Sequence, residues 1–211
     1  ITNVAFDGET PNSTTSEGVT IWSTDGIQYE RNRNKNFDRA GLTIVDGWIK
    51  VVNNCVFQNN TAGISSYATA PLNSSLEIGQ LNTQNRNYFT KNQKAIESYG
   101  ADGLNSGRLK VFDNEIDSCS VGILLEGNNE HDIRANRIEN TTFGIPVANS
   151  GNNLSYIRCN DISNSQLGIL YRGNNSNSQF KYNNFAFTSG VEVLLYSFTG
   201  TPASVRSIQG A

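Results

Sequence analysis

Two glutamates, two tyrosines and an arginine are the residues in this sequence whose types and spacing could act on a sugar. Glu97 and Glu126 belong to successive units of a repeat, so their carboxyls are expected on one face of the molecule. Two carboxyls about 6.5–9.5 Å apart can hydrolyse a glycosidic bond, one as general acid and the other as general base. Tyr67, Tyr99 and Arg172 are expected on the same face, where rings can stack on sugars and a guanidinium can bind hydroxyls or uronates. The candidate ligand-binding residues are therefore Tyr67, Tyr99, Glu126 and Arg172, and Glu97 with Glu126 is the catalytic pair if the protein is an enzyme.

The same residues also have an ordinary interpretation. Any solenoid surface carries scattered tyrosines and charges. Nothing near Glu97 or Glu126 in the sequence would raise the pKa of one carboxyl and make it the acid. Both interpretations stay open at this point.

A second candidate surface consists of the cations Arg134, Arg158 and Lys181. They recur at one position of the repeat and are expected to form an outward row without intervening carboxylates. Like charges in such a row repel one another. An anionic ligand, a neighbouring acidic row or another chain could lie against them.

No metal or cofactor site is expected. Asp102, with Arg108 nearby, supplies too few oxygens for a calcium site, which needs six or more. Cys55, Cys119 and Cys159 occupy three different positions of the repeat, which favours small buried hydrophobes over disulfides or a zinc site. The lone histidine, His131, is expected to point inward as a structural residue.

These residues are placed by a repeat of the form Asn-x-Ile, five residues, Gly-Ile. It runs from Asn114 to Ile123, from Asn136 to Ile145 and from Asn160 to Ile169. Further copies of the glycine position are Gly18, Gly41, Gly63, Ala95 and Gly190, most of them 22 to 24 residues apart. Self-similarity at this period is typical of a solenoid.

Three short strands are expected in each turn of the solenoid. Apolar residues alternate after the glycine, as in Ile123 and Leu125, and this period of two indicates a strand with one buried face. A second strand would carry Ile116 and its equivalents, and a third Val111 and its equivalents. The expected fold is all-β, with about eight turns and no helix.

An asparagine ladder is predicted at the corner before the second strand. Its members are Asn87, Asn114, Asn136, Asn160 and Asn183, and Cys55 interrupts it one turn earlier. Turns stacked at about 4.8 Å allow identical amides to bond along the row. A tight corner also needs a residue at positive φ, which asparagine tolerates, so we expect the ladder residues to adopt it.

From Gly18 to Leu195 the repeat resembles that of the right-handed parallel β-helix proteins of the pectate-lyase-like superfamily. The resemblance implies a single-stranded right-handed parallel β-helix and a secreted or cell-surface protein. Polygalacturonase-like members of that superfamily need clustered aspartates, a Gly-His-Gly and an Arg-Ile-Lys segment, and none of these strings occurs here. The resemblance is therefore specific for fold and weak for activity.

Composition limits the function classes. The chain has 211 residues, a net charge of −3 and no run of eighteen apolar residues, which argues against nucleic-acid binding and a membrane span. We expect one domain over residues 1–211, with 1–17 as an N-terminal edge segment and 196–211 as the exit from the last coil. Because the sequence starts at Ile1 and contains no methionine, it is expected to be a processed product or a piece of a larger protein.

Two long repeat spacings predict insertions near residues 66–80 and 99–108, both after the Gly-Ile strand and protruding from one edge. Loops collected on one face of a repeat protein often form its binding surface.

Three hypotheses about function follow. The first is a non-catalytic module that serves as scaffold, adhesin or glycan-binding face. The second is a polysaccharide lyase or glycoside hydrolase acting beside these insertions. The third is a piece whose end coils stack on other parts of a larger chain.

Overall fold

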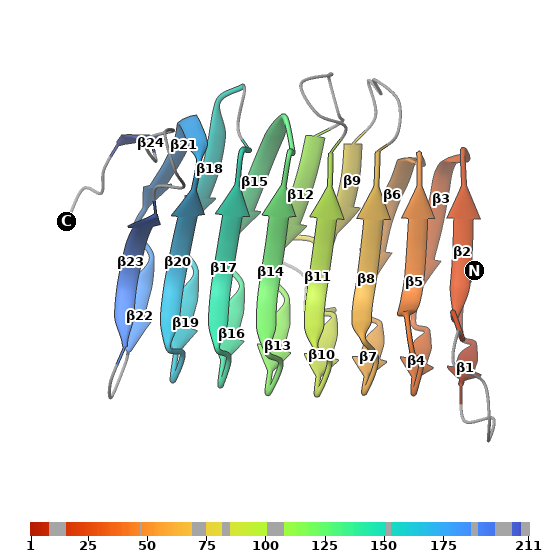
Figure 1. Ribbon diagram of the computed structural model, residues 1–211. Helices are drawn as coiled ribbons and strands as arrows, with labels where there is room; N and C mark the ends of the chain where they lie inside the picture. Colours follow the sequence, from red (N-terminus) through yellow and green to blue (C-terminus); the bar gives the residue numbers. More distant parts are fainter. Residues whose placement is uncertain are drawn as a thin grey trace.

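The computed structural model describes residues 1–8, 16–46, 48–68, 75–81, 85–100, 108–150, 153–186, 190–196 and 204–207. These residues form three parallel sheets of eight strands, and each turn of the chain adds one strand to every sheet. The result is a stacked coil in which neighbouring turns lie side by side along the axis (Figure 1). The predicted all-β parallel solenoid with three strands per turn is confirmed.

The front sheet carries the Gly-Ile strands and faces the reader in Figure 1. It consists of β2 (Val19–Trp22), β5 (Ala40–Val45), β8 (Ala62–Tyr67), β11 (Lys94–Tyr99), β14 (Val121–Glu126), β17 (Phe143–Ala148), β20 (Leu167–Arg172) and β23 (Val191–Tyr196).

The short-strand sheet follows the asparagine corner. It consists of β1 (Ala5–Asp7), β4 (Arg33–Lys35), β7 (Val56–Gln58), β10 (Tyr88–Thr90), β13 (Glu115–Asp117), β16 (Arg137–Glu139), β19 (Asp161–Ser163) and β22 (Asn184–Ala186). The rear sheet consists of β3 (Asp25–Glu30), β6 (Trp48–Asn53), β9 (Ser75–Ile78), β12 (Arg108–Phe112), β15 (Glu130–Arg134), β18 (Ser155–Arg158), β21 (Asn174–Lys181) and β24 (Ser204–Ser207).

The stack amounts to about seven turns, slightly fewer than the eight predicted. Eight strands in a sheet are separated by seven steps, which accounts for the difference. Both ends of the sequence contribute strands. Within the expected edge segment 1–17, β1 pairs with β4, and within the expected exit 196–211, β24 pairs with β21.

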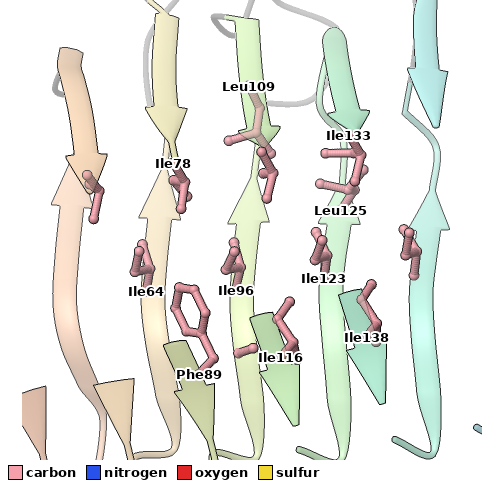
Figure 2. Packing of buried hydrophobic residues seen from close by; sticks show 14 of the residues in the cluster. Ile64, Ile78, Phe89, Ile96, Leu109, Ile116, Ile123, Leu125, Ile133 and Ile138 are labelled. Carbon is pink, nitrogen blue, oxygen red and sulfur yellow. The ribbon is translucent and has the colours of Figure 1, made fainter. Parts of the chain in front are cut away.

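The core is a continuous apolar spine inside the coil. Ile64, Ile96 and Ile123 lie directly above one another on the front sheet, and none of them is accessible to solvent. Figure 2 shows Phe89, Ile116 and Ile138 stacked in the same way on the short-strand sheet. Because every turn buries the same inward positions, the core grows by one layer per turn.

The glycine before each isoleucine permits this close stacking. A Cβ on Gly144 would lie 2.5 Å from the carbonyl oxygen of Gly168, and one on Gly63 would lie 2.6 Å from that of Ala95. A Cβ at these two positions would clash with the next turn, so glycine is required there, whereas the equivalent position of β11 accommodates the buried Ala95. The glycine position is thus set by the approach of the next turn.

The predicted asparagine ladder is confirmed. The side-chain amide of each asparagine donates to the side-chain oxygen of the next, with N–O distances of 2.9 to 3.0 Å from Asn87 through Asn114, Asn136 and Asn160 to Asn183. Cys55 interrupts the ladder as expected, although its backbone N–H still donates to the side-chain oxygen of Asn87. In the turn before Cys55, Asn32 occupies the same corner position, and the prediction omitted this residue.

The expected positive φ at the ladder residues is wrong. At every ladder position except Asn87 the positive φ lies one residue earlier, at Arg31, Asn54, Asp113, Ala135, Cys159 and Tyr182. The turn is made by that preceding residue, which leaves the asparagine extended with its amide directed into the coil. Cys159 is exposed at this corner, so the expectation that it is a buried hydrophobe is wrong. Cys55 and Cys119 are buried, as expected. Burial raises the pKa of both of these thiols to about 11.

Replacing Ala135 with glycine is expected to stabilise the protein by about 1 kcal/mol, because alanine is strained at a φ of 58° and glycine is not. Urea unfolding monitored by circular dichroism measures the change. Ala62→Gly is the matched control, because Ala62 is buried in an extended strand, and its replacement should lower stability instead. If both substitutions changed the free energy of unfolding in the same direction, the assignment of a positive φ to Ala135 would be contradicted.

Two further polar rows line the other corners and were not predicted. Between the short-strand sheet and the front sheet, the amide of Asn60 donates to Asn92 at 3.0 Å, and Thr141 and Ser165 bond at 2.7 Å. After the front sheet, the backbone N–H of Asn128 donates to the Ser150 hydroxyl at 3.1 Å, and the backbone N–H of Ser150 donates to the side-chain oxygen of Asn175 at 2.9 Å. Serine and threonine replace asparagine in these rows, which hides them from a search for a single residue type.

The insertions differ in part from the prediction. Ile78 and Phe89 are 11 residues apart, whereas the aligned Val111 and Ile116 are five apart, so six extra residues follow the rear sheet rather than the Gly-Ile strand. The remaining extra residues of the first insertion and all those of the second follow the front sheet. Residues 69–74 and 101–107 lie outside the described part of the chain.

Candidate functional site

The outer face of the front sheet brings the four predicted ligand-binding residues into one row. In this row Tyr67 pairs with Tyr99, Tyr99 with Glu126, Glu126 with Ala148, and Ala148 with Arg172. The rings of Tyr67 and Tyr99 stack with centroids 5.4 Å apart and an interplanar angle of 11°. The guanidinium of Arg172 lies 3.8 Å from a carboxylate oxygen of Glu126, across Ala148.

Glu97 lies in the adjacent row, beside Ser65 on one side and Leu124 on the other. Only 6% of the residue is exposed. One carboxylate oxygen accepts a hydrogen bond from the Ser65 hydroxyl at 2.6 Å, and the other accepts from Lys94 at 2.5 Å and from the Tyr99 hydroxyl at 3.0 Å. Glu97 and Glu126 therefore occupy different rows, and the carboxylate of Glu97 is fully engaged by its neighbours.

This network shifts the pKa of two of its members. Burial lowers the pKa of the Lys94 ammonium, but the hydrogen bond and charge of Glu97 outweigh it and leave the pKa raised. Burial, followed by the negative charge of Glu97, raises the pKa of the Tyr99 phenol. Lys94 thus stays charged and Tyr99 stays neutral, so the phenol donates a hydrogen bond to Glu97 and is held beside Tyr67.

Replacing Glu97 with glutamine is expected to lower the free energy of unfolding by about 2 kcal/mol, because it leaves the ammonium of Lys94 without its counter-charge. Urea unfolding measures this change. Glu139→Gln removes the exposed pair between Glu139 and Arg137 and serves as the control, with an expected change within about 0.5 kcal/mol. A Glu97→Gln protein as stable as wild type would show that the network has no structural role.

A shallow groove of about 460 Å³ lies on the outer face at the N-terminal half of the front sheet. Its floor is made by Thr20, Thr43 and Ser65 from three successive turns, with Glu97 at one end. Trp22 and Tyr67, both exposed, form one wall. The groove thus presents a row of hydroxyls beside a wall with two aromatic rings, which is an arrangement suited to a polar ligand with flat apolar faces.

The opposite wall of the groove is charged. Glu17, Asp38 and Arg39 line it. The guanidinium of Arg39 lies 2.9 Å from a carboxylate oxygen of Glu17, whose other oxygen accepts from the Thr20 hydroxyl at 2.9 Å. The groove therefore offers carboxylate acceptors next to its floor.

Sequence reasoning missed most of this groove. It identified Tyr67 and Glu97 but not Trp22, Thr20 or Thr43. The alternation of Val19 and Ile21 was visible and already implied that Thr20 and Trp22 face outward. The charged wall could not be found from strand alternation, because Glu17 precedes β2 and Asp38 and Arg39 precede β5.

Residues 17–185 match the family described as the right handed beta helix region. The chain belongs to this family. Searches of curated proteins and of solved structures gave no match. The family match covers every strand of the groove and agrees with the parallel coil described above.

The second candidate surface of this beta-helix protein lies on the rear sheet. Arg134, Arg158 and Lys181 do form one row, as predicted. The row is not a set of isolated cations, however, because Arg158 makes two hydrogen bonds with Asp132 of the adjacent row, at 2.7 and 3.2 Å. Arg158 and Lys181 also lie over the ring of Tyr156, at 4.7 and 5.3 Å from its centroid. A single neighbouring carboxylate, Asp132, accounts for Arg158, and the aligned positions of its row are Lys110 and Tyr156 rather than further acids.

Within the described residues of this beta-helix protein, no group of three or more histidine, cysteine, aspartate or glutamate side chains could hold a metal ion. The same part of the chain contains no helix that is long and apolar enough to cross a membrane.

Proposed function

We propose that this beta-helix protein is a non-catalytic glycan-binding module and that its ligand lies in the groove on the front sheet. One observation carries the proposal, namely that Trp22 and Tyr67 form a wall along one side of a floor of hydroxyls contributed by successive turns. Sugar rings combine apolar faces with hydroxyl edges, so they match aromatic walls and polar floors.

The groove runs across several turns of the coil, which favours an oligosaccharide over a single sugar. Thr20, Thr43 and Ser65 repeat the same polar position at each step along the axis. Successive strands are about 4.8 Å apart, so three turns offer hydroxyls over roughly 10 Å. A chain of sugar residues lying along the axis can use each of them.

Binding is favoured over hydrolysis because neither candidate catalytic carboxylate is placed for the chemistry. Glu97 has both oxygens engaged by Ser65, Lys94 and Tyr99. Glu126 lies in the row of Tyr67 and Tyr99, two turns beyond the turn that supplies Tyr67 to the groove wall. A polysaccharide lyase or hydrolase remains the alternative that an activity assay tests.

The proposed setting is secreted or on the cell surface, with a polysaccharide or surface glycan as partner. A rigid coil with a single binding face would serve there as a scaffold or adhesin. The abundance of asparagine, serine, threonine and glycine with only 17% charged residues supports this setting.

Replacing Tyr67 with alanine is expected to weaken glycan binding about tenfold, because it removes one of the two rings of the aromatic wall and the ring that Tyr99 stacks on. A glycan array identifies the oligosaccharide, and isothermal titration calorimetry measures its affinity for each variant. Tyr88→Ala is the matched control, because Tyr88 is similarly exposed but lies on the short-strand sheet.

Two outcomes would contradict the proposal. Equal losses of affinity in the Tyr67 and Tyr88 variants would show that the ligand does not use the groove. Shortening of the bound oligosaccharide by the purified wild-type protein, followed by chromatography, would show that the module is an enzyme.

A further inference from the structure

The C-terminal half of the front sheet carries an apolar outer face. Three of its four strands, β14, β17 and β20, present six apolar side chains that are each partly exposed. These side chains, here called the apolar stripe, are Val121, Leu124, Phe143, Pro146, Leu167 and Leu170. Fully buried residues such as Ile123 and Ile145 lie between them along each strand, so the stripe is not part of the core.

The arrangement of the stripe is symmetric about the strand β17. Val121 and Leu167 align on either side of Phe143. In the row that borders the stripe, Glu126 and Arg172 align on either side of Ala148. The face thus has an apolar centre, a carboxylate on one side and a guanidinium at the equivalent place on the other.

We propose that a second copy of this chain docks on the apolar stripe, related by a two-fold axis that is parallel to the strands and passes over β17. A two-fold axis exchanges the turns on its two sides, so Leu124 meets Leu170 of the second copy and Glu126 meets Arg172 of the second copy. The same surface serves both copies, as an isologous interface requires. Charge complementarity at both ends of an apolar patch is what selects a second copy as the occupant.

The ion pair within one copy does not remove this complementarity. Glu126 and Arg172 approach only to 3.8 Å, and their side chains keep 45% and 48% of their surface exposed. A pair this long and exposed contributes little within the chain. Both groups can therefore contact an opposite charge from outside.

The proposed dimer leaves the groove free. The groove lies mainly on β2, β5 and β8, whereas the stripe lies on β14, β17 and β20. Pairing centred on β17 places the β2 to β8 end of each copy beyond the last coil of the other. The two copies then hold two grooves on one rigid body, an arrangement that raises the apparent affinity for a long ligand. The dimer itself does not depend on the identity of that ligand.

Sedimentation velocity of charge-reversed variants tests the proposal. Glu126→Arg places arginine against arginine across the two-fold axis, and Arg172→Glu places glutamate against glutamate. Each variant alone is expected to weaken self-association at least about tenfold. A mixture of the two variants is expected to recover it, because the arginine introduced in one variant then meets the glutamate introduced in the other. An ion pair within one copy cannot explain recovery on mixing.

The control is Arg137→Glu, an equal charge change on the short-strand sheet, which should leave self-association unchanged. Circular dichroism confirms that each variant keeps its fold. A wild-type protein that stays monomeric up to about 100 μM would overturn the proposal. So would a mixture of the two variants that associates no better than either variant alone.

Discussion

Replacing Asn136 with leucine is expected to lower the free energy of unfolding by about 4 kcal/mol. The side-chain oxygen of Asn136 accepts from both the backbone and the side-chain nitrogen of Asn114. Its amide nitrogen donates to the backbone oxygens of Val111 and Arg134 and to the side chain of Asn160. Leucine fills the space but leaves several buried donors and acceptors unpaired, each at a cost of about 1–3 kcal/mol. Urea unfolding monitored by circular dichroism measures the loss.

Asn164→Gly provides the control for this substitution. Asn164 is exposed at the next corner with a φ of 50°, where glycine is equally suited. Its replacement should change stability by no more than about 0.5 kcal/mol. If the two variants unfolded at similar urea concentrations, the ladder would not be a main source of stability.

Acid is expected to destabilise the protein through His131. This residue is buried inside the rear sheet, where its Nε2 lies 3.0 Å from the Ser178 hydroxyl and its Nδ1 has no hydrogen-bond partner in the described structure. Burial lowers its pKa from the ordinary 6.5 to about 3. Between these values the unfolded chain binds a proton that the folded chain does not, so stability falls as the pH is lowered.

The expected loss between pH 6.5 and pH 4.5 is about 2.3 kcal/mol, because over this range the unfolded histidine goes from half protonated to almost fully protonated while the folded one stays neutral. Urea unfolding at a series of pH values measures it. The sequence contains no other histidine, so the His131→Leu variant isolates the effect. Leucine already occupies the aligned position in the preceding turn, at Leu109, and is compatible with the site. A variant that lost as much stability as wild type over this range would show that carboxylates, rather than His131, cause the acid sensitivity.

The repeat made most of the fold predictable from the sequence. Once Gly63, Ala95 and Gly122 were aligned, the register of the front sheet followed, and with it the row of Tyr67, Tyr99 and Glu126. In a solenoid the sequence period is also the spatial period, so residues far apart in sequence are placed as neighbours.

Features set by side-chain contacts or by one residue's backbone were not predictable in this way. The positive φ at Ala135 rather than Asn136 depends on which residue makes the turn. The engagement of Glu97 by Lys94 depends on how a long side chain folds over its own strand. The neutralisation of Arg158 by Asp132 crosses between rows, which alignment of single rows does not reveal.

The groove was missed for a different reason. One of its walls contains Trp22 from β2, and the opposite wall contains Asp38 and Arg39, which precede β5. These residues are not equivalent positions of the repeat. A search for repeated positions therefore overlooks a site that is built where the repeat varies.

The most direct test of the proposed binding site is a nuclear magnetic resonance titration of the labelled protein with the oligosaccharide selected on the array. The groove proposal predicts that the largest shifts arise in β2, β5 and β8, including the indole N–H of Trp22 and the amides of Thr43 and Ser65. Shifts centred instead on Arg134, Arg158 and Lys181 of the rear sheet would place the ligand on the other candidate surface and contradict the proposal.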